Sequence, residues 1–215
     1  MNIQPVTLTG KLIRLEPLHR SHVEELTDAG KDKSIWRYLM DGPIYENWGM
    51  AALVHYLLDC EKQGIDLPFA VVCRETKDVI GCTRYLNIEL HNRALEIGTW
   101  FSKDYQGTGV NTESKYLLLR HAFETLYCIR VQFKIDVRNE ASIRAIERLG
   151  AIKEGEMRKH VILADGHQRT SALYSILDHE WPKEKAHIEA LMARSENAAP
   201  RPRQANGAIA RSISS

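Results

Sequence analysis

Several features are missing from this 215-residue sequence, and each absence narrows the class of protein it encodes. It carries 29 basic and 28 acidic residues, a formal net charge of +1, which gives no electrostatic reason to expect nucleic acid as the main partner. No apolar run approaches the ~18 residues that a membrane span requires, so no membrane partner is expected. Met1–Gly10 has neither the charged nor the apolar segment of a secretory signal, and a cytoplasmic location is therefore expected.

Cysteine is scarce, and no two cysteines are spaced as a C-x-x-C pair. The four cysteines are Cys60, Cys73, Cys82 and Cys128, and each lies in an apolar or element-like context. We expect reduced thiols in the core rather than disulfides or metal ligands. His19 and His22 could share one helical face, but no third ligand lies nearby, so no metal site is expected.

What the sequence does contain is a succession of short helical and extended patterns, enough for one domain. The expected helices are 19–29, 46–63, 112–126 and 139–149, and the expected strands are 6–18, 69–73, 79–90, 94–101, 130–137, 156–163 and 169–177. Short connections imply antiparallel pairing from 69 to 101, whereas the strand–turn–helix–strand unit after it is the one parallel unit. The predicted fold is therefore α+β, with about seven strands in a mixed, mostly antiparallel sheet and about four helices.

The chain divides into three parts by composition. Residues 1–182 form the predicted folded domain, and 183–194 a C-terminal helical extension. Residues 195–215 contain Ala-Ala-Pro-Arg-Pro-Arg followed by small polar residues, a composition that buries little apolar surface. We expect a disordered tail there.

The most informative stretch is Tyr105–Asn111, which reads YQGTGVN and connects a strand pattern to a helix pattern. Glycine has no Cβ, so two glycines at such a turn allow the backbone to approach a ligand closely. The first N–H groups of the helix have no intrahelical partner and lie at the positive end of its dipole. The turn is therefore suited to a phosphate or pyrophosphate, with an ordinary helix-initiating turn as the alternative.

Five segments, in this order and at this spacing, resemble the GNAT superfamily of acyl-CoA-dependent N-acyltransferases and, within it, the RimJ/RimL-type branch. They are Thr9–Leu15, Val79–Gly81, Leu95–Gly98, the pyrophosphate-loop match Gln106–Gly109, and Asn139–Ser142 leading to Leu149-Gly150-Ala151. The resemblance spans roughly residues 8 to 181. Two positions depart from the family pattern: Asn111 stands where Gly or Ala is usual, and Ala151 replaces Phe. A Rossmann site fits poorly, because the loop lacks the third glycine.

The resemblance implies a GNAT fold that binds acetyl-CoA as the acyl donor and needs no metal. In this fold two central parallel strands, here 95–101 and 130–137, are splayed apart to admit the pantetheine arm. The residues implied to hold the donor are Gln106, Gly107, Thr108, Gly109, Val110 and Asn111 at the pyrophosphate, and Thr99, Trp100, Phe101 and Asn139 along the pantetheine arm. Trp100 and Phe101 as plain core aromatics, and Asn139 as a plain helix N-cap, are the alternatives.

Two residues are candidates for the chemistry. By resemblance Ser142, in the first turn of helix 139–149, could donate to the CoA sulfur as the thiolate leaves. The alternative is a Ser that only assists capping. Glu96 lies within a strand, and Gly98 should leave space beside it, so Glu96 could accept a proton from the incoming amine. The alternative is a Glu on an exposed face of the strand, or one paired with Arg93 or Arg84, and Glu89 is a second candidate for the base.

The acceptor site is expected from the first two helices, the loop between them and the final hairpin. Its candidate residues are Trp36, Tyr38, Tyr45, Trp48 and Tyr85 as an aromatic wall, with Arg158 and His160. The predicted function is an acetyl-CoA-dependent N-acetyltransferase acting on a primary amine, either a protein N-terminus or a small molecule, by direct transfer in a ternary complex. A non-catalytic CoA-binding module, or a longer acyl donor, is the alternative. A monomer or homodimer is expected, and the sequence does not identify the amine.

Overall fold

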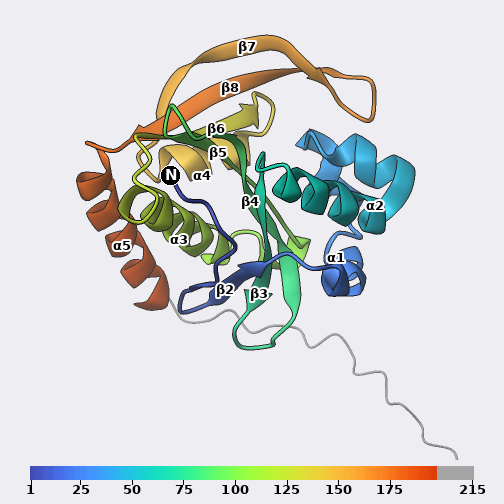
Figure 1. The fold of residues 1–215 in the computed structure, drawn as a ribbon, viewed down its shortest axis with the longest axis horizontal. Helices are drawn as coiled ribbons and strands as arrows, with labels where there is room; N and C mark the ends of the chain where they lie inside the picture. The colour runs from blue at the N-terminus through green and yellow to red at the C-terminus, as the bar shows by residue number, and fades with distance from the viewer. Residues whose placement is uncertain (198–215) are drawn as a thin grey trace, which may run out of the picture.

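Eight strands form one mixed sheet in the order β1-β2-β3-β4-β5-β6-β8-β7 (Figure 1). The computed structural model describes residues 1–197. The strands are β1 Leu8–Thr9, β2 Ile13–Pro17, β3 Leu67–Cys73, β4 Val79–Glu89, β5 Ala94–Phe101, β6 Arg130–Asp136, β7 Ile152–Ile162 and β8 Gln168–Leu177. All neighbouring strands are antiparallel except β5 and β6, which are parallel. The mixed, mostly antiparallel sheet predicted from the sequence is confirmed.

Helices cover both faces of the sheet (Figure 1). They are α1 Val23–Ala29, α2 Gly42–Lys62, α3 Val110–Glu124, α4 Glu140–Glu147 and α5 Trp181–Asn197, with short 3-10 segments at Arg20–His22, Lys33–Tyr38 and Lys103–Tyr105. Helices α1 and α2 lie on one side of the sheet, and α3 and α5 on the other, while β7 and β8 arch over its far end. Among the described helices, none has the length and apolarity to cross a membrane.

The side-chain alternation of β5 separates two hydrophobic cores. Leu95, Ile97 and Phe101 belong to the core under α3, whereas Trp100 belongs to the core under α1 and α2. This is the period-2 arrangement expected for a strand that is buried on both faces. Because β5 lies at the centre of the sheet, a side chain on one of its faces is isolated from those on the other.

The first predicted strand, 6–18, is wrong as a single strand, because the chain folds back on itself. The Gly10 N–H donates to the Ile13 carbonyl at 2.9 Å, which makes a hairpin of β1 and β2. The Glu113 carboxylate of α3 accepts hydrogen bonds from the backbone N–H groups of Lys11, Leu12 and Ile13 at 2.7–2.9 Å. A Cβ on residue 10 would lie 2.5 Å from the Glu113 Cδ, so a larger residue there would displace the carboxylate that holds the hairpin.

Two other boundaries differ from the prediction. Helix α2 begins at Gly42 rather than 46 and is interrupted at Gly49, whose φ of 79° and ψ of −178° are not helical. Helix α5 extends beyond both ends of the predicted extension 183–194, and residues 195–197 are helical where the tail was expected to start. The rest of the predicted tail lies outside the described residues. The remaining predicted helices and strands are present, with small shifts at their ends.

Candidate functional site

Strands β5 and β6 separate after only three paired residues. Their register is Ala94–Arg130, Leu95–Val131 and Glu96–Gln132, and no further pair joins them. Each strand nevertheless continues, β5 against β4 as far as Phe101 and β6 against β8 as far as Asp136. The edges that face each other beyond Glu96 therefore have no strand partner, and backbone N–H and C=O groups without a partner are strong hydrogen-bonding groups. The predicted splay of the central strands is confirmed.

The glycine turn follows the unpaired part of β5 and leads into α3. Gly107 and Gly109 have φ of 75° and 90°, in the left-handed region that glycine tolerates best. A Cβ on Gly107 would meet no atom within 4 Å, so the backbone conformation, and not crowding within the protein, calls for glycine there. Gly109 directly precedes the 15-residue helix α3, whose first N–H groups lack intrahelical partners and lie at the positive end of the dipole.

Side chains of the turn fold back on the chain that precedes it. The Gln106 amide nitrogen donates to the Phe101 carbonyl at 3.3 Å, and the Thr108 hydroxyl donates to the Tyr105 carbonyl at 2.7 Å. Gln106, Gly107 and Thr108 remain exposed. The turn is thus held at the end of β5 while its backbone faces solvent.

A buried lysine that sequence reasoning missed explains the unusual Asn111. The Lys115 amine donates to the Asn111 Oδ1 at 3.2 Å and to the Thr99 hydroxyl at 2.6 Å. The Thr99 hydroxyl also lies 2.6 Å from that of Thr83 on β4. Lys115 is 4% exposed, and burial lowers the pKa of its amine to about 7. The available signal was a lysine one turn after Asn111 and one turn before the apolar Leu118 and Leu119 of α3.

The side chains of Trp100 and Phe101 are core residues. Trp100 packs near Trp36, with ring centroids 5.0 Å apart, and Phe101 is buried in the core under α3. Any contact of these two residues with a ligand in the splay would therefore come from their backbone.

Helix α4 follows β6, the other splayed strand, and carries Asn139 and Ser142 at its start. The Asn139 Oδ1 accepts the Ser142 N–H at 3.1 Å, so Asn139 is the N-cap of α4. Ser142 is half-buried. From the end of the same helix, the Arg148 guanidinium donates to the Thr112 hydroxyl in the first turn of α3 at 3.0 Å. Arg148 is a second cation near this turn that the sequence analysis did not identify.

On the opposite face of β5, Glu96 is 2% exposed and its carboxylate has three partners, all on Oε2. Lys134 Nζ lies 2.8 Å away, Asn87 Nδ2 donates at 2.9 Å, and Gln132 Nε2 donates at 3.3 Å. The ion pair is thus with Lys134 rather than with Arg93 or Arg84. Within residues 1–197 no donor bonds to Oε1.

The expectation that Gly98 leaves space beside Glu96 is wrong. A Cβ on Gly98 would lie 3.2 Å from the Leu86 Cδ2 and 3.8 Å from the Arg84 side chain, so these two residues already fill that position. Arg84 is itself held by Asp41 at 2.9 Å and Asp66 at 3.4 Å. Its Nη1 is buried without a hydrogen-bond partner among the described residues.

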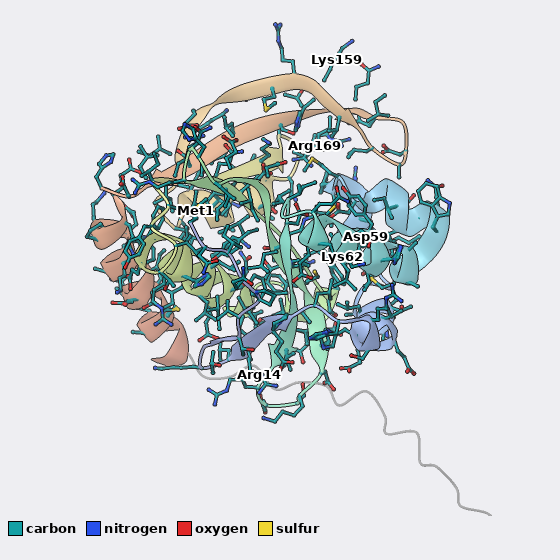
Figure 2. The ribbon with its side chains drawn as sticks, in the orientation of Figure 1. Met1, Arg14, Asp59, Lys62, Lys159 and Arg169 are labelled. Carbon is teal, nitrogen blue, oxygen red and sulfur yellow. The ribbon has the colours of Figure 1, made fainter. Side chains whose placement is uncertain are left out.

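The final hairpin contributes charge to the Glu96 side of the sheet. Arg169 lies beneath β8 while Lys159 projects outward from β7 (Figure 2). The Arg169 guanidinium donates to the carbonyls of Tyr38 and Lys134, both at 2.9 Å. Burial, with the positive charges of Lys134 and Arg169, lowers the pKa of His160, whose Nδ1 lies 3.0 Å from the Ser171 hydroxyl. His160 is therefore neutral at pH 7.

The aromatic residues do not form the single wall that the sequence suggested. Trp36 is buried and stacked on Tyr45, with ring centroids 4.0 Å apart, in the core under α1 and α2. Tyr85 lies on the other side of the sheet, where its hydroxyl donates to the Leu118 carbonyl of α3 at 2.6 Å. Trp48 is 69% exposed. Of the five aromatic residues, Tyr38 contacts Arg169, through its backbone carbonyl.

Sequence and structure comparisons give the family. The sequence profile of the acetyltransferase (GNAT) domain matches residues 13–152, more than half of the chain. The chain belongs to the GNAT family. Its sheet, its splay and its glycine turn are thus those of an acyltransferase fold, as the resemblance implied, and the enzyme class expected from the sequence is confirmed.

Two curated relatives differ in the acceptor that their names give. The "Putative ribosomal N-acetyltransferase YdaF" of Bacillus subtilis (strain 168) is 36% identical over 99 residues, 46% of this chain and 54% of its own length. The chain thus matches only about half of that relative. The spermidine N(1)-acetyltransferase of Escherichia coli (strain K12) is 25% identical over 171 residues, 79% of this chain and 88% of its own length.

Two solved structures share the fold. A "putative acetyltransferase" from T. thermophilus is 38% identical, with a TM-score of 0.80 over 89% of this chain and 99% of that one. Mycobacterium smegmatis RimJ in complex with CoA-disulfide is 20% identical, with a TM-score of 0.75 over 88% of this chain and 96% of that one. The latter shows a common fold, and the RimJ/RimL-type resemblance is borne out by these relatives together. Members of this family transfer an acyl group from acetyl-CoA to an amine.

Proposed function

We propose that this protein is an acetyl-CoA-dependent N-acetyltransferase that transfers the acetyl group directly to a primary amine in a ternary complex. The observation that carries the proposal is the end of β5–β6 pairing at Glu96–Gln132, just before the turn that opens α3. An opened pair of strands next to a helix N-terminus offers amide partners to a pantetheine arm and N–H donors to its pyrophosphate.

The donor is held mostly by backbone in this proposal. The N–H groups of residues 106–111 bind the pyrophosphate, and the unpaired edge of β5 at Thr99, Trp100 and Phe101 bonds the pantetheine amides. Asn139 uses its Oδ1 for the cap, which leaves its amide N–H groups to donate to the same arm. Arg148, fixed at the Thr112 hydroxyl, adds positive charge near the phosphates.

The chemistry needs a neutral amine and a stabilised thiolate. In the proposed reaction the ammonium of the acceptor loses a proton to Glu96, and the amine nitrogen then attacks the thioester carbonyl. A C–N bond forms and the C–S bond breaks, while the Ser142 hydroxyl donates a hydrogen bond to the departing thiolate. The nitrogen loses its second proton to that thiolate, so that CoA leaves as the thiol. The three partners on Oε2 hold the carboxylate in place, which leaves Oε1 to receive the proton, directly or through water.

The acceptor is a primary amine, and two classes are open to test. One relative is named for a ribosomal acceptor and another for spermidine, so both a protein N-terminal amine and a small polyamine belong in the first experiment. Charge near the proposed transfer point is mixed, because Glu96 lies close to Lys134 and Arg169 contacts the Lys134 carbonyl. This gives no preference for a polycation over a peptide.

The test is release of free CoA thiol from acetyl-CoA in the presence of a panel of amines: N-terminal peptides, intact proteins, polyamines and aminoglycosides. Release that depends on one amine class and saturates at low concentration supports the proposal. Tight binding of acetyl-CoA with no thiol release across the panel would favour a non-catalytic CoA-binding module. Propionyl- and succinyl-CoA, compared with acetyl-CoA on the best amine, determine the acyl chain that is preferred.

A further inference from the structure

Lys115 connects the two parts of the proposed donor site. Its amine donates both to Thr99, in the unpaired half of β5, and to Asn111, in the first turn of α3. The first residue belongs to the edge proposed for the pantetheine arm, and the second to the turn proposed for the pyrophosphate. One buried amine therefore couples the position of the strand to the position of the turn.

The surroundings of this amine contain little negative charge. The hydroxyls of Thr99 and Thr83 face it from β5 and β4. On α3 itself, the carboxylate nearest along the chain belongs to Glu113, and it already accepts three backbone N–H groups of the β1–β2 hairpin. Further along α3, the ring of His121 lies 3.2 Å from the Tyr85 hydroxyl.

No other charge compensates the ammonium within residues 1–197. From α4, Arg148 reaches the first turn of α3 and adds only positive charge. In the same part of the chain Lys115 makes no ion pair with a carboxylate, and burial is the cause of its lowered pKa. An ammonium at this place lacks a counter-charge in the protein alone, which is costly in a buried position.

We propose that Lys115 is a positioning residue that takes up a proton when the diphosphate of the acyl donor binds at the turn 106–111. The diphosphate supplies the counter-charge, and the resulting ammonium, with three donors instead of two, fixes Asn111 and Thr99 in their binding positions. Binding and protonation then favour each other equally, as linkage requires. The inference rests on the proposed acetyl-CoA site.

The experiment is titration calorimetry of the wild-type protein with acetyl-CoA, without an acceptor, between pH 7.5 and 9. Two buffers of different ionisation enthalpy report the number of protons taken up. A phosphate monoester has its second pKa near 6, so the ligand itself changes little in this window. We expect uptake that approaches one proton, and an affinity that falls by up to about tenfold for each pH unit.

Two variants separate the coupling from a structural effect. In Lys115→Met the proton uptake and the pH dependence of the affinity disappear. In Lys103→Met, which removes an exposed lysine just before the same turn, both remain. Melting temperatures of the variants confirm that they are folded.

Three results would overturn the inference. Wild-type binding without proton uptake rules it out, whatever the variants do, and so does an unchanged pH dependence in Lys115→Met. If the wild-type protein does not bind acetyl-CoA at all, the proposed function itself is wrong. That outcome is distinguishable from binding that is tight but independent of pH.

Discussion

The two faces of β5 differ in whether a buried ionisable side chain has an ion-pair partner. On one face the Glu96 carboxylate lies 2.8 Å from the Lys134 amine and accepts two more hydrogen bonds. On the other face, the Thr99 hydroxyl receives a lysine amine that has no carboxylate partner within residues 1–197. The paired carboxylate has its counter-charge within the protein, whereas the unpaired amine has none among the described residues. The comparison teaches that one strand can neutralise a buried charge within the fold on one face and leave a buried amine without a counter-charge on the other.

The faces differ also in what builds them. The proposed donor side uses backbone: an unpaired strand edge, two glycines with positive φ and a helix N-terminus. The Glu96 side uses side chains that come from β4, β5, β6 and the final hairpin. Substitutions on the Glu96 side should therefore leave acetyl-CoA affinity unchanged, and substitutions on the proposed donor side should leave the proposed proton acceptor unchanged.

The largest expected effect is that of replacing Glu96, the paired carboxylate, on the rate of acetyl transfer. Replacing Glu96 with Gln removes the proposed proton acceptor, and we expect kcat/KM for the amine to fall by about 10²-fold or more, with loss of the acid limb of the pH–rate profile. Acetyl-CoA affinity should stay within about twofold, since Glu96 lies on the other face of β5. Steady-state rates and calorimetry measure the two quantities.

The control for this substitution is Glu154→Gln, which removes another ion-paired carboxylate, held by Arg130, on the neighbouring strands. It should keep the wild-type profile. A Glu96→Gln enzyme with an unaltered pH–rate profile would exclude Glu96 as the base and direct attention to His160, which is neutral at pH 7 because its pKa is lowered.

The next effect concerns the backbone of the donor side. Replacing Gly107 with Val places a β-branched residue at φ 75°, and we expect acetyl-CoA binding to weaken by about 10- to 100-fold through backbone strain and the bulk at the ligand. Gly64→Val is the matched control: its φ is 70°, and a Cβ there likewise meets nothing within 4 Å. Both should lose similar stability, but only Gly107→Val should lose the ligand, and equal affinities would contradict the pyrophosphate assignment.

The unpaired Lys115 amine predicts that the free energy of unfolding depends on pH. Lys115 has a pKa of about 7 in the fold, against 10.5 for an ordinary lysine, so the unfolded chain binds more protons between these two values. The free energy of unfolding should therefore rise with pH across this window, by at most about 1.4 kcal/mol per unit from this group. Below pH 7 the cost of burying the ammonium is fully present.

The measurement is denaturant unfolding of wild type and Lys115→Met at pH 7 and pH 9, without acetyl-CoA. The difference in stability between the two proteins should favour the variant at pH 7 and shrink at pH 9. A difference that does not change with pH would show that the folded protein binds this proton as tightly as the unfolded chain does, so that the pKa of the Lys115 amine is not lowered.

The smallest expected effect is that of Arg148. Arg148→Met should weaken acetyl-CoA binding by about three- to fivefold, and less at high salt, because an exposed cation near a phosphate is screened. Arg144→Met, one turn earlier on α4 and paired with Glu140, is the control and should change nothing measurable. Equal effects of the two substitutions would remove Arg148 from the proposed donor site.

Local sequence patterns predicted most of the helices and strands, because side-chain alternation and glycine conformation depend on neighbouring residues. The alternation in β5 and the glycines of the turn identified a strand and a left-handed backbone without any tertiary information. The β1–β2 hairpin was missed, because its reversal depends on the Glu113 carboxylate about a hundred residues away. The aromatic wall failed for the same reason, since nothing local indicates that Tyr85 points to α3.

The sequence by itself predicted the backbone features of the proposed donor side, since glycines, a helix N-cap and strand periods are properties of adjacent residues. Only the tertiary structure decided which charges meet. It paired Glu96 with Lys134 from the neighbouring strand, and it placed Lys115 between Thr99 and Asn111 without a carboxylate among the described residues. Charge pairing depends on distances between residues far apart in the chain, and a sequence contains those distances only through the fold.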